Sequence, residues 1–350
     1  MTNSRTTDAL DAAHYTLRVE QTAAIVPCVG FVLCLDRMDP AGVQEFHDRG
    51  LEALGGAVTH YRAEQMKGRA PITGRTRKML QTWLAKPTAG KQYYLEYYGC
   101  ADEKGVTGAG LSIHLTPRTY AGQTPEFWQR WLASWKKLYE EGVRHLLPCT
   151  VLRITFPLDH PLAHADALLA WIKRLRLVDS GEFASGYAGY ALNHYANIGS
   201  ASQRLMYERL AALVLQHPGF DWHNTHYIVD RLLPFNPQTE TFLPLIKRTN
   251  WLSLLSERTV AHLGGRQRVE ELLAASAGID VDTVANGMAI QAGSVPQTGD
   301  IPTGDTLPLF RSVAKVLRPV RMEALRGPGD GFPDERAQEW LEAFDEGSPA

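Results

Sequence analysis

The sequence predicts an α+β fold, with mixed or antiparallel sheets built from strand–helix–strand units and with helices packed on the sheet faces. Three observations indicate this class. Residues 181–195 alternate like a central strand, residues 91–115 have the pattern of an aromatic β-hairpin, and residues 203–216 have helical periodicity. Because helices alternate with strands and a hairpin is present, all-α and all-β folds are excluded.

The central strand is expected in the stretch GEFASGYAGYALNHY, residues 181–195. Phe183 and Tyr187 fall on one of its faces, and Gly186 and Gly189 leave room for another backbone or an aromatic ring. A phosphate-binding loop would need its glycines at the start of a helix, and the next helical pattern begins only near residue 200. We therefore expect a core strand here and no phosphate site.

In the N-terminal half, apolar or alternating runs predict strands, and apolar residues at helical spacing predict helices. One helix begins at Asp39-Pro40, where Asp can cap the helix and Pro suits its first position, and ends at Gly55-Gly56. The other expected elements are strands at 15–20, 23–35, 57–62, 91–99 and 108–115, and helices at 76–85 and 125–141.

The same patterns continue through the C-terminal half, where residues 250–263 form either an apolar strand or a helix pair. The other expected elements are strands at 151–156 and 287–292 and helices at 162–175, 203–216, 267–275 and 307–317. We expect residues 1–326 to form one α+β domain, or two similar halves at about 15–145 and 146–326. Residues 327–350 form an acidic C-terminal tail, whose short amphipathic pattern predicts a helix that docks only in part.

The composition allows a large core and points to no polyanionic partner for the molecule as a whole. The chain has 350 residues, 44% of them hydrophobic, and a net charge of −2. Charge is nevertheless uneven: residues 62–91 hold eight basic residues and one acid, whereas residues 327–350 hold seven acids and one arginine. A solvated basic face is the expected role of the first segment, and a polyanion site is the alternative.

The cysteines and the N-terminus indicate a cytosolic protein. The four cysteines include no C-x-x-C pair, so neither a zinc site nor a disulfide framework is predicted. The N-terminus has no apolar signal core, and no apolar stretch reaches the roughly 18 residues of a membrane span.

No motif singles out a catalytic or metal site. Residues 221–226 (DWHNTH) place two histidines three apart, but carboxylates are few nearby. Residues 159–166 fit a helix start, and Ser185 lacks the glycine that a nucleophile elbow needs two residues earlier. The sequence therefore indicates no cofactor, and it favours a protein that binds another protein over an enzyme.

Three segments carry a resemblance to a known family: residues 184–193, 250–265 and 287–321 together resemble the TsiV family of type VI immunity proteins. The similarity runs from about Val19 to Arg321 and leaves out the acidic tail. It implies a cytosolic immunity protein of a type VI secretion system. The implied partner is an effector toxin with a VRR-NUC or related PD-(D/E)xK nuclease domain. The resemblance also implies a stoichiometric inhibitor with no catalytic residues.

A nuclease presents a basic cleft to DNA, so its inhibitor gains affinity from carboxylates and exposed aromatic rings. Two sets of residues are candidates for this toxin-binding surface. The hairpin set is Tyr93, Tyr94, Glu96, Tyr97, Tyr98, Asp102 and Glu103, and the tail set is Asp334, Glu335, Glu339, Trp340 and Glu342. The alternatives are core tyrosines with a solvated turn for the hairpin set and a solubilising end for the tail set.

Two other functional classes stay open at this point. One is a nucleic-acid-binding or metal-dependent enzyme that uses the basic residues 62–91 or the histidine cluster 221–226. The other is a small-ligand module with a pocket among the tyrosines.

Overall fold

A computed structural model gives the architecture, and it describes most of the chain. The described residues are 10–36, 39–64, 66, 68–85, 92–101, 105–116, 130, 133–134, 136–137, 140, 149–194, 200–222, 232, 235–236, 241–285 and 287–345. Most of the expected helix at 125–141 lies outside these residues. The fold is α+β, as the sequence predicts, and its centre is a 12-stranded sheet.

The sheet is antiparallel except for one short parallel pair. Its strands are β1 (Leu17–Val19), β2 (Thr22–Leu35), β3 (His60–Ala63), β4 (Ala70–Pro71), β5 (Tyr93–Tyr98), β6 (Gly110–Leu115), β7 (Thr150–Phe156), β8 (Ser185–Asn193), β9 (Asp221–Trp222), β12 (Leu252–Ser256), β13 (Ile279–Val284) and β14 (Gly287–Ala292). They run in the order β13-β14-β12-β8-β2-β7-β6-β5-β3-β4, with β1 paired to β2 and β9 paired in parallel to β8. Strands β10 (Phe235–Asn236) and β11 (Thr241–Phe242) form a separate pair.

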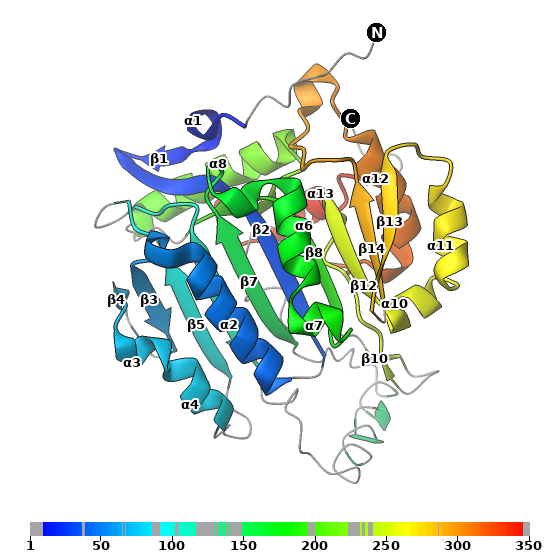
Figure 1. Cartoon of the computed structure of the whole chain (residues 1–350). Helices are drawn as coiled ribbons and strands as arrows, with labels where there is room; N and C mark the ends of the chain where they lie inside the picture. The colour runs from blue at the N-terminus through cyan, green and yellow to red at the C-terminus, as the bar shows by residue number, and fades with distance from the viewer. Residues whose placement is uncertain are drawn as a thin grey trace.

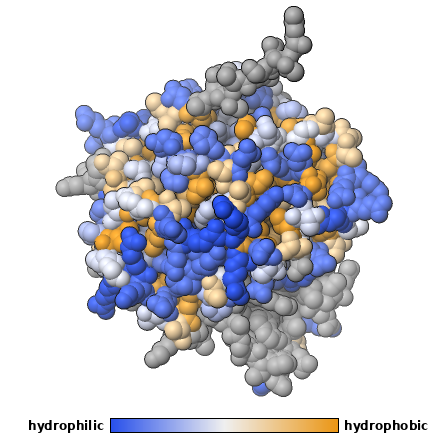
Figure 2. Space-filling model, viewed as in Figure 1, coloured by the Kyte–Doolittle hydropathy of each residue, from blue (hydrophilic) through white to orange (hydrophobic). Residues whose placement is uncertain are grey.

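Helices lie on both faces of this sheet. They are α1 (Ala12–Tyr15), α2 (Pro40–Leu54), α3 (Gly74–Arg77), α4 (Met79–Ala85), α6 (Ala165–Lys173), α7 (Arg176–Asp179), α8 (Ser200–Gln216), α10 (Glu257–His262), α11 (Arg266–Leu273), α12 (Pro308–Leu317) and α13 (Asp334–Leu341). Helices α2, α6 and α7 cover the face turned to the viewer, and α8 and α13 lie behind the sheet (Figure 1). Over α2, α6 and α7 the surface is mainly hydrophilic, with hydrophobic residues in small patches between (Figure 2).

The core between the front helices and the sheet is built on aromatic rings. Phe31 of β2 lies 6.4 Å from Phe46 of α2 and 6.4 Å from Trp171 of α6, measured between ring centroids. The start of α2 follows from its local sequence, because the Asp39 side chain accepts a hydrogen bond from the Ala41 amide and Pro40 occupies the first turn. Gly55 then ends the helix at a φ of 52°, a conformation that favours glycine.

The predicted central strand is confirmed as β8, and so is the reason for its glycines. Gly30 of β2 lies directly opposite Gly189 of β8. A Cβ atom on Gly186 would lie 3.0 Å from Cδ1 of Leu33 and from the carbonyl oxygen of Val32. The glycines therefore allow β2 and its side chains to approach β8 closely.

The two expected halves do not form separate sheets. Strand β2, from the first half, lies between β7 and β8 of the second half, and β7 continues to β6 of the first half. The ambiguous segment at 250–263 is strand β12 followed by helix α10. Strand β13 was not expected. Its sequence IDVDTV is polar because it is an edge strand whose Asp280 and Asp282 are exposed.

Residues 327–345, which the sequence suggested as an acidic tail, pack against the rest of the described chain. Helix α13 packs against α8, and Trp340, at 0% exposure, is fully buried. A Cβ atom on Gly327 would lie 1.8 Å from the Phe332 carbonyl oxygen, and one on Gly331 would lie 2.1 Å from the Arg204 carbonyl oxygen. Any side chain at these two positions would collide with neighbouring backbone, so glycine allows the segment to pack this closely against the rest of the fold.

Candidate interaction surfaces

The hairpin set is largely buried. Glu96 is 4% exposed, Tyr98 is 3% exposed, and the hydroxyl of the buried Tyr97 donates a hydrogen bond to the Thr76 carbonyl oxygen at 3.2 Å. Burial raises the pKa of Tyr97 and Tyr98 well above the usual range of a tyrosine. Tyr94 is half-buried, and its ring lies 5.8 Å from the Arg62 guanidinium carbon.

This burial corrects the idea of the hairpin as an open aromatic surface. Tyr93 is buried as well, and Asp102 and Glu103 lie outside the described residues. The sequence showed a strand, but its alternation could not reveal that both faces of β5 are covered. Core tyrosines, the alternative stated above, describe the residues of β5 better.

A small hollow beside the hairpin does not favour a ligand site. Tyr93, Tyr94 and His114 are among its lining residues, and its volume is about 200 Å³. Pockets for small molecules usually enclose roughly 300–1,000 Å³. A metabolite pocket among these tyrosines therefore has little support.

The tail set divides between the surface and the core. Asp334, Glu335 and Glu339 of α13 are exposed, and Glu339 pairs with Arg336 at 3.1 Å. Asp334 also accepts a hydrogen bond from the Gly327 amide at 2.9 Å. Acids in the first turn suit the positive end of the helix dipole. The helix thus turns a carboxylate-rich face to solvent.

Trp340 lies on the opposite side of α13, above two buried cations. The Arg248 guanidinium carbon is 3.9 Å from the Trp340 ring centroid, and the Lys247 Nζ is 4.9 Å from it. The indole Nε1 donates a hydrogen bond to the Phe220 carbonyl oxygen at 3.2 Å. Trp340 therefore anchors the helix by cation–π contact and by apolar burial.

The two cations differ in how they are neutralised. The Lys247 Nζ forms an ion pair with Asp221 at 2.6 Å and donates to the Trp222 carbonyl oxygen at 2.8 Å. In the described part of the chain, the Arg248 guanidinium nitrogens have no hydrogen-bond partner. Burial lowers the pKa of Lys247 and lowers that of Arg248 to about 9. The ring faces that cover Arg248 and the nearby charges of Asp221 and Asp345 therefore offset part of the cost of its burial.

This ion pair also bears on the proposed histidine cluster. Asp221 is occupied by Lys247, and His223 and His226 lie outside the described residues. Among the described residues, no three His, Cys, Asp or Glu side chains are placed to hold a metal ion. None of the described helices is long and apolar enough to cross a membrane.

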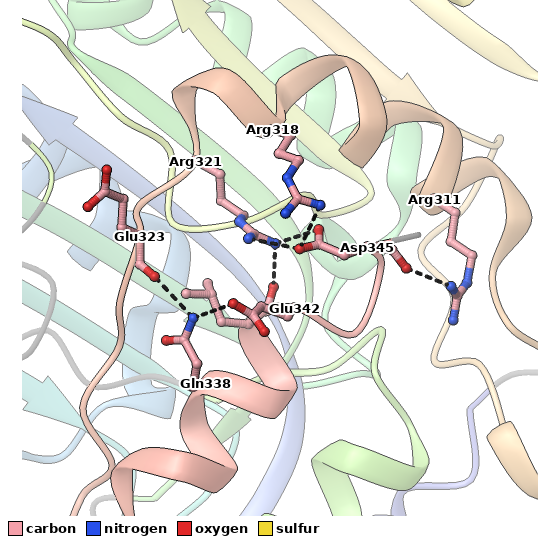
Figure 3. Close-up of polar contacts among 8 residues, drawn as sticks. Arg311, Arg318, Arg321, Glu323, Gln338, Glu342 and Asp345 are labelled. Carbon is pink, nitrogen blue, oxygen red and sulfur yellow. Dashed lines mark hydrogen bonds and ion pairs between the residues drawn. The ribbon is translucent and has the colours of Figure 1, made fainter. Parts of the chain in front are cut away.

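Ionic and polar contacts hold the end of α13 (Figure 3). Arg321 binds both carboxylate oxygens of Asp345, at 2.7 and 3.0 Å, and Arg318 reaches the same carboxylate at 3.2 Å. The Gln338 Nε2 donates to the Glu323 carbonyl oxygen at 3.0 Å. A bidentate arginine–carboxylate pair fixes direction as well as distance, so the acidic face is presented on a rigid support.

The sequence singled out Trp340 as a candidate contact residue, but it did not indicate that Trp340 packs on Lys247 and Arg248. The only local signal was the Lys247-Arg248 pair between two apolar runs, LPLI and NWLSLL. Charged residues inside an apolar stretch are rarely buried unless they are paired.

The described basic residues of segment 62–91 have different surroundings. Arg62 lies over Tyr94, and Arg69 donates a hydrogen bond to the Gly105 carbonyl oxygen at 3.3 Å. Arg75 and Lys78 instead line a hollow beside α4. Lys67, Lys86 and Lys91 lie outside the described residues. Tracking a nucleic-acid backbone requires several cations in line, so the described residues do not favour a polyanion site.

Comparison with known proteins identifies the family. The model of the TsiV family, type VI immunity for VRR-NUC, matches residues 101–344. The match includes α13, although the sequence resemblance was expected to end at Arg321. The structure is similar to that of the Pseudomonas aeruginosa type VI secretion protein PA0821, with a TM-score of 0.64, and the two chains are 17% identical. The alignment covers 94% of this chain and 85% of that chain, and at this identity the likeness concerns the fold. Among curated proteins, none matches the sequence. The family match covers well over half of the chain, which therefore belongs to the TsiV family of type VI immunity proteins.

Proposed function

We propose that this immunity protein neutralises its cognate effector, a nuclease of the VRR-NUC class, by covering the effector's DNA-binding cleft with the exposed acidic face of α13. The observation that carries the proposal is the set of exposed carboxylates Asp334, Glu335 and Glu339 on a firmly anchored helix. This helix lies within the residues that match the family model.

The physical argument concerns charge and rigidity. A cleft that binds the DNA backbone is positively charged, so carboxylates can occupy the positions of phosphates. Complementary charge also speeds the encounter of the two proteins. Because Trp340 and Asp345 already hold α13 in place, little conformational entropy is lost when the effector binds.

Within this proposal the chain is a binder and not an enzyme. Glu96, Tyr98 and Trp340 have structural roles, and the contacts with the effector come from exposed residues of α13. We propose a cytoplasmic location because the effector's substrate, DNA, lies in that compartment.

The test is a charge reversal that leaves the helix anchored. We expect Glu335→Lys with Glu339→Lys to weaken binding of the purified effector by about tenfold or more, chiefly through a slower association rate. Loss of protection in cells that express the effector should accompany the weaker binding. Asp334 is left intact because it also bonds the Gly327 amide.

The matched control is Glu270→Lys with Glu271→Lys on α11, which changes the charge of two exposed acids on another helix by the same amount. The control should bind the effector like the native chain. Unchanged affinity of the α13 variant, measured by biolayer interferometry, would contradict the proposed surface.

A further inference from the structure

A second surface of the opposite charge lies at the far edge of the sheet. Helices α3 and α4 lie beside strands β3 and β4 there (Figure 1). Between them is a hollow with a volume of about 810 Å³. Its walls include half-buried aromatic and sulfur-containing side chains, and exposed cations stand at its rim. The wall residues are Tyr61, Met66, Met79 and Trp83. The rim cations are Arg75 and Lys78.

Local structure holds this hollow in shape. Thr73 and Thr76 form a capping box at the start of α3, and the buried Thr76 carbonyl oxygen accepts the hydrogen bond from Tyr97. The Trp83 ring lies 5.1 Å from the ring of Tyr93 on β5. These contacts hold α3 and α4 against strand β5.

The two rim cations are available for binding. In the part of the chain that the structure describes, no carboxylate pairs with Arg75 or Lys78, and both side chains are exposed. Glu64 also lines the hollow, on the side of β3. Charges without partners beside an apolar wall attract a ligand that has both carboxylates and an apolar group.

The residue types match those of protein interfaces. Tyrosine, tryptophan, methionine and arginine are enriched where proteins meet, and methionine adapts its shape to an apolar side chain. A nucleic acid fits less well, because Arg62 and Arg69 are engaged elsewhere and, among the described residues, the hollow offers only the cations Arg75 and Lys78.

We propose that this hollow binds an acidic segment of a partner protein, with an apolar side chain of that segment against Met66, Met79 and Trp83 and its carboxylates on Arg75 and Lys78. This goes beyond the proposed function, because it adds a second interaction surface with the opposite charge preference. The lining residues all lie before residue 101, where the family match begins. The hollow and α13 also lie at different places along the sheet. Strand β3, beside the hollow, is separated from β8 by β5, β6, β7 and β2. Strand β9, which pairs with β8, carries Trp222, and Trp222 contacts Trp340 of α13.

The test uses a fluorescein-labelled peptide in which a leucine and a phenylalanine are flanked by aspartate and glutamate residues. Binding to the full chain is measured by fluorescence anisotropy. One control peptide replaces the carboxylates by amides, and another replaces the two apolar residues by serine. We expect saturable binding of the acidic peptide, with both control peptides weaker by about tenfold.

The chain itself is tested with Arg75→Glu combined with Lys78→Glu, which should weaken the acidic peptide by at least about tenfold. A matched control, Arg204→Glu with Arg209→Glu on α8, makes a similar charge change at exposed residues and should leave binding unchanged. A third variant, Met79→Ala, should weaken the peptide without any change of charge. Thermal melting checks that each variant is folded.

Three results would overturn the proposal. The first is that the acidic peptide shows no saturable binding. The second is that the Arg75→Glu/Lys78→Glu variant binds the peptide as tightly as the native chain. The third is that a duplex oligonucleotide binds the chain and loses more affinity than the peptide does in this variant. None of these measurements involves the effector, so the outcome is independent of the proposed role of α13.

Discussion

At the scale of single residues, the most consequential contact is between Trp340 and Arg248. A buried guanidinium without hydrogen bonds is costly, and the aromatic faces of Trp340 and Phe344, together with the charges of Asp221 and Asp345, offset part of that cost. Trp340 also fills space beside Trp222, at 5.8 Å between ring centroids. One side chain thus supports both a cation and the packing of α13.

This double role predicts a large effect of Trp340→Ala. We expect the free energy of unfolding to fall by about 3–5 kcal/mol, the usual cost of removing a buried tryptophan, measured by urea denaturation. Trp340→Phe keeps a ring over Arg248 and should cost clearly less. A loss below about 1 kcal/mol for Trp340→Ala would show that the ring does not carry the anchoring.

At the scale of elements, α13 is held at its C-terminal end by the ion pairs of Asp345. The side chains of Arg321 and Asp345 are 11% and 10% exposed, so solvent screens this pair only in part. The pair connects Asp345, which lies just beyond the end of α13, to Arg321 in the segment that follows α12, and Arg321 also donates a hydrogen bond to the Leu341 carbonyl oxygen in the last turn of α13 at 3.1 Å. It therefore determines whether α13 presents its acidic face in one orientation.

Asp345→Asn should loosen the helix without altering its exposed carboxylates. We expect faster hydrogen exchange at the amides of α13 and no change in β8, because the bidentate pair is lost while the sheet is untouched. Asp330→Asn, at an exposed acid in the same segment, is the matched control. Equal exchange in α13 for Asp345→Asn and the native chain would exclude the clamp.

Elements were predictable from sequence where the signal was local. The alternation and glycines of β8, and the Asp39-Pro40 start of α2, depend on neighbouring residues and were identified correctly. The burial of Glu96 depends on what covers the hairpin from elsewhere in the chain. Strand β13 was missed because Asp280 and Asp282 lower its strand propensity.

The candidate site was predictable only in part, for the same reason. The carboxylates Glu335 and Glu339 are visible in the sequence as an acidic cluster. The rigid support of these carboxylates is not visible in the sequence, because Trp340 packs on Lys247 and Arg248, which are far away along the chain. Sequence periodicity shows an amphipathic helix but not the partner of its apolar side.

At the scale of the whole molecule, the two proposed interaction surfaces lie at different places on one fold. The acidic face of α13 lies within the family match, and the basic hollow beside α4 lies outside it. Family membership, inferred from three sequence segments, is confirmed by the family match over residues 101–344.

The most direct test of the central claim is a competition between this protein and DNA for the purified effector nuclease domain. Labelled duplex DNA bound to that domain, with a chelator present to prevent cleavage, is titrated with the immunity protein and followed by fluorescence anisotropy. Occlusion by α13 predicts complete release of the DNA at one equivalent, and the Glu335→Lys/Glu339→Lys variant should require a large excess. A stable ternary complex of effector, DNA and immunity protein would contradict occlusion.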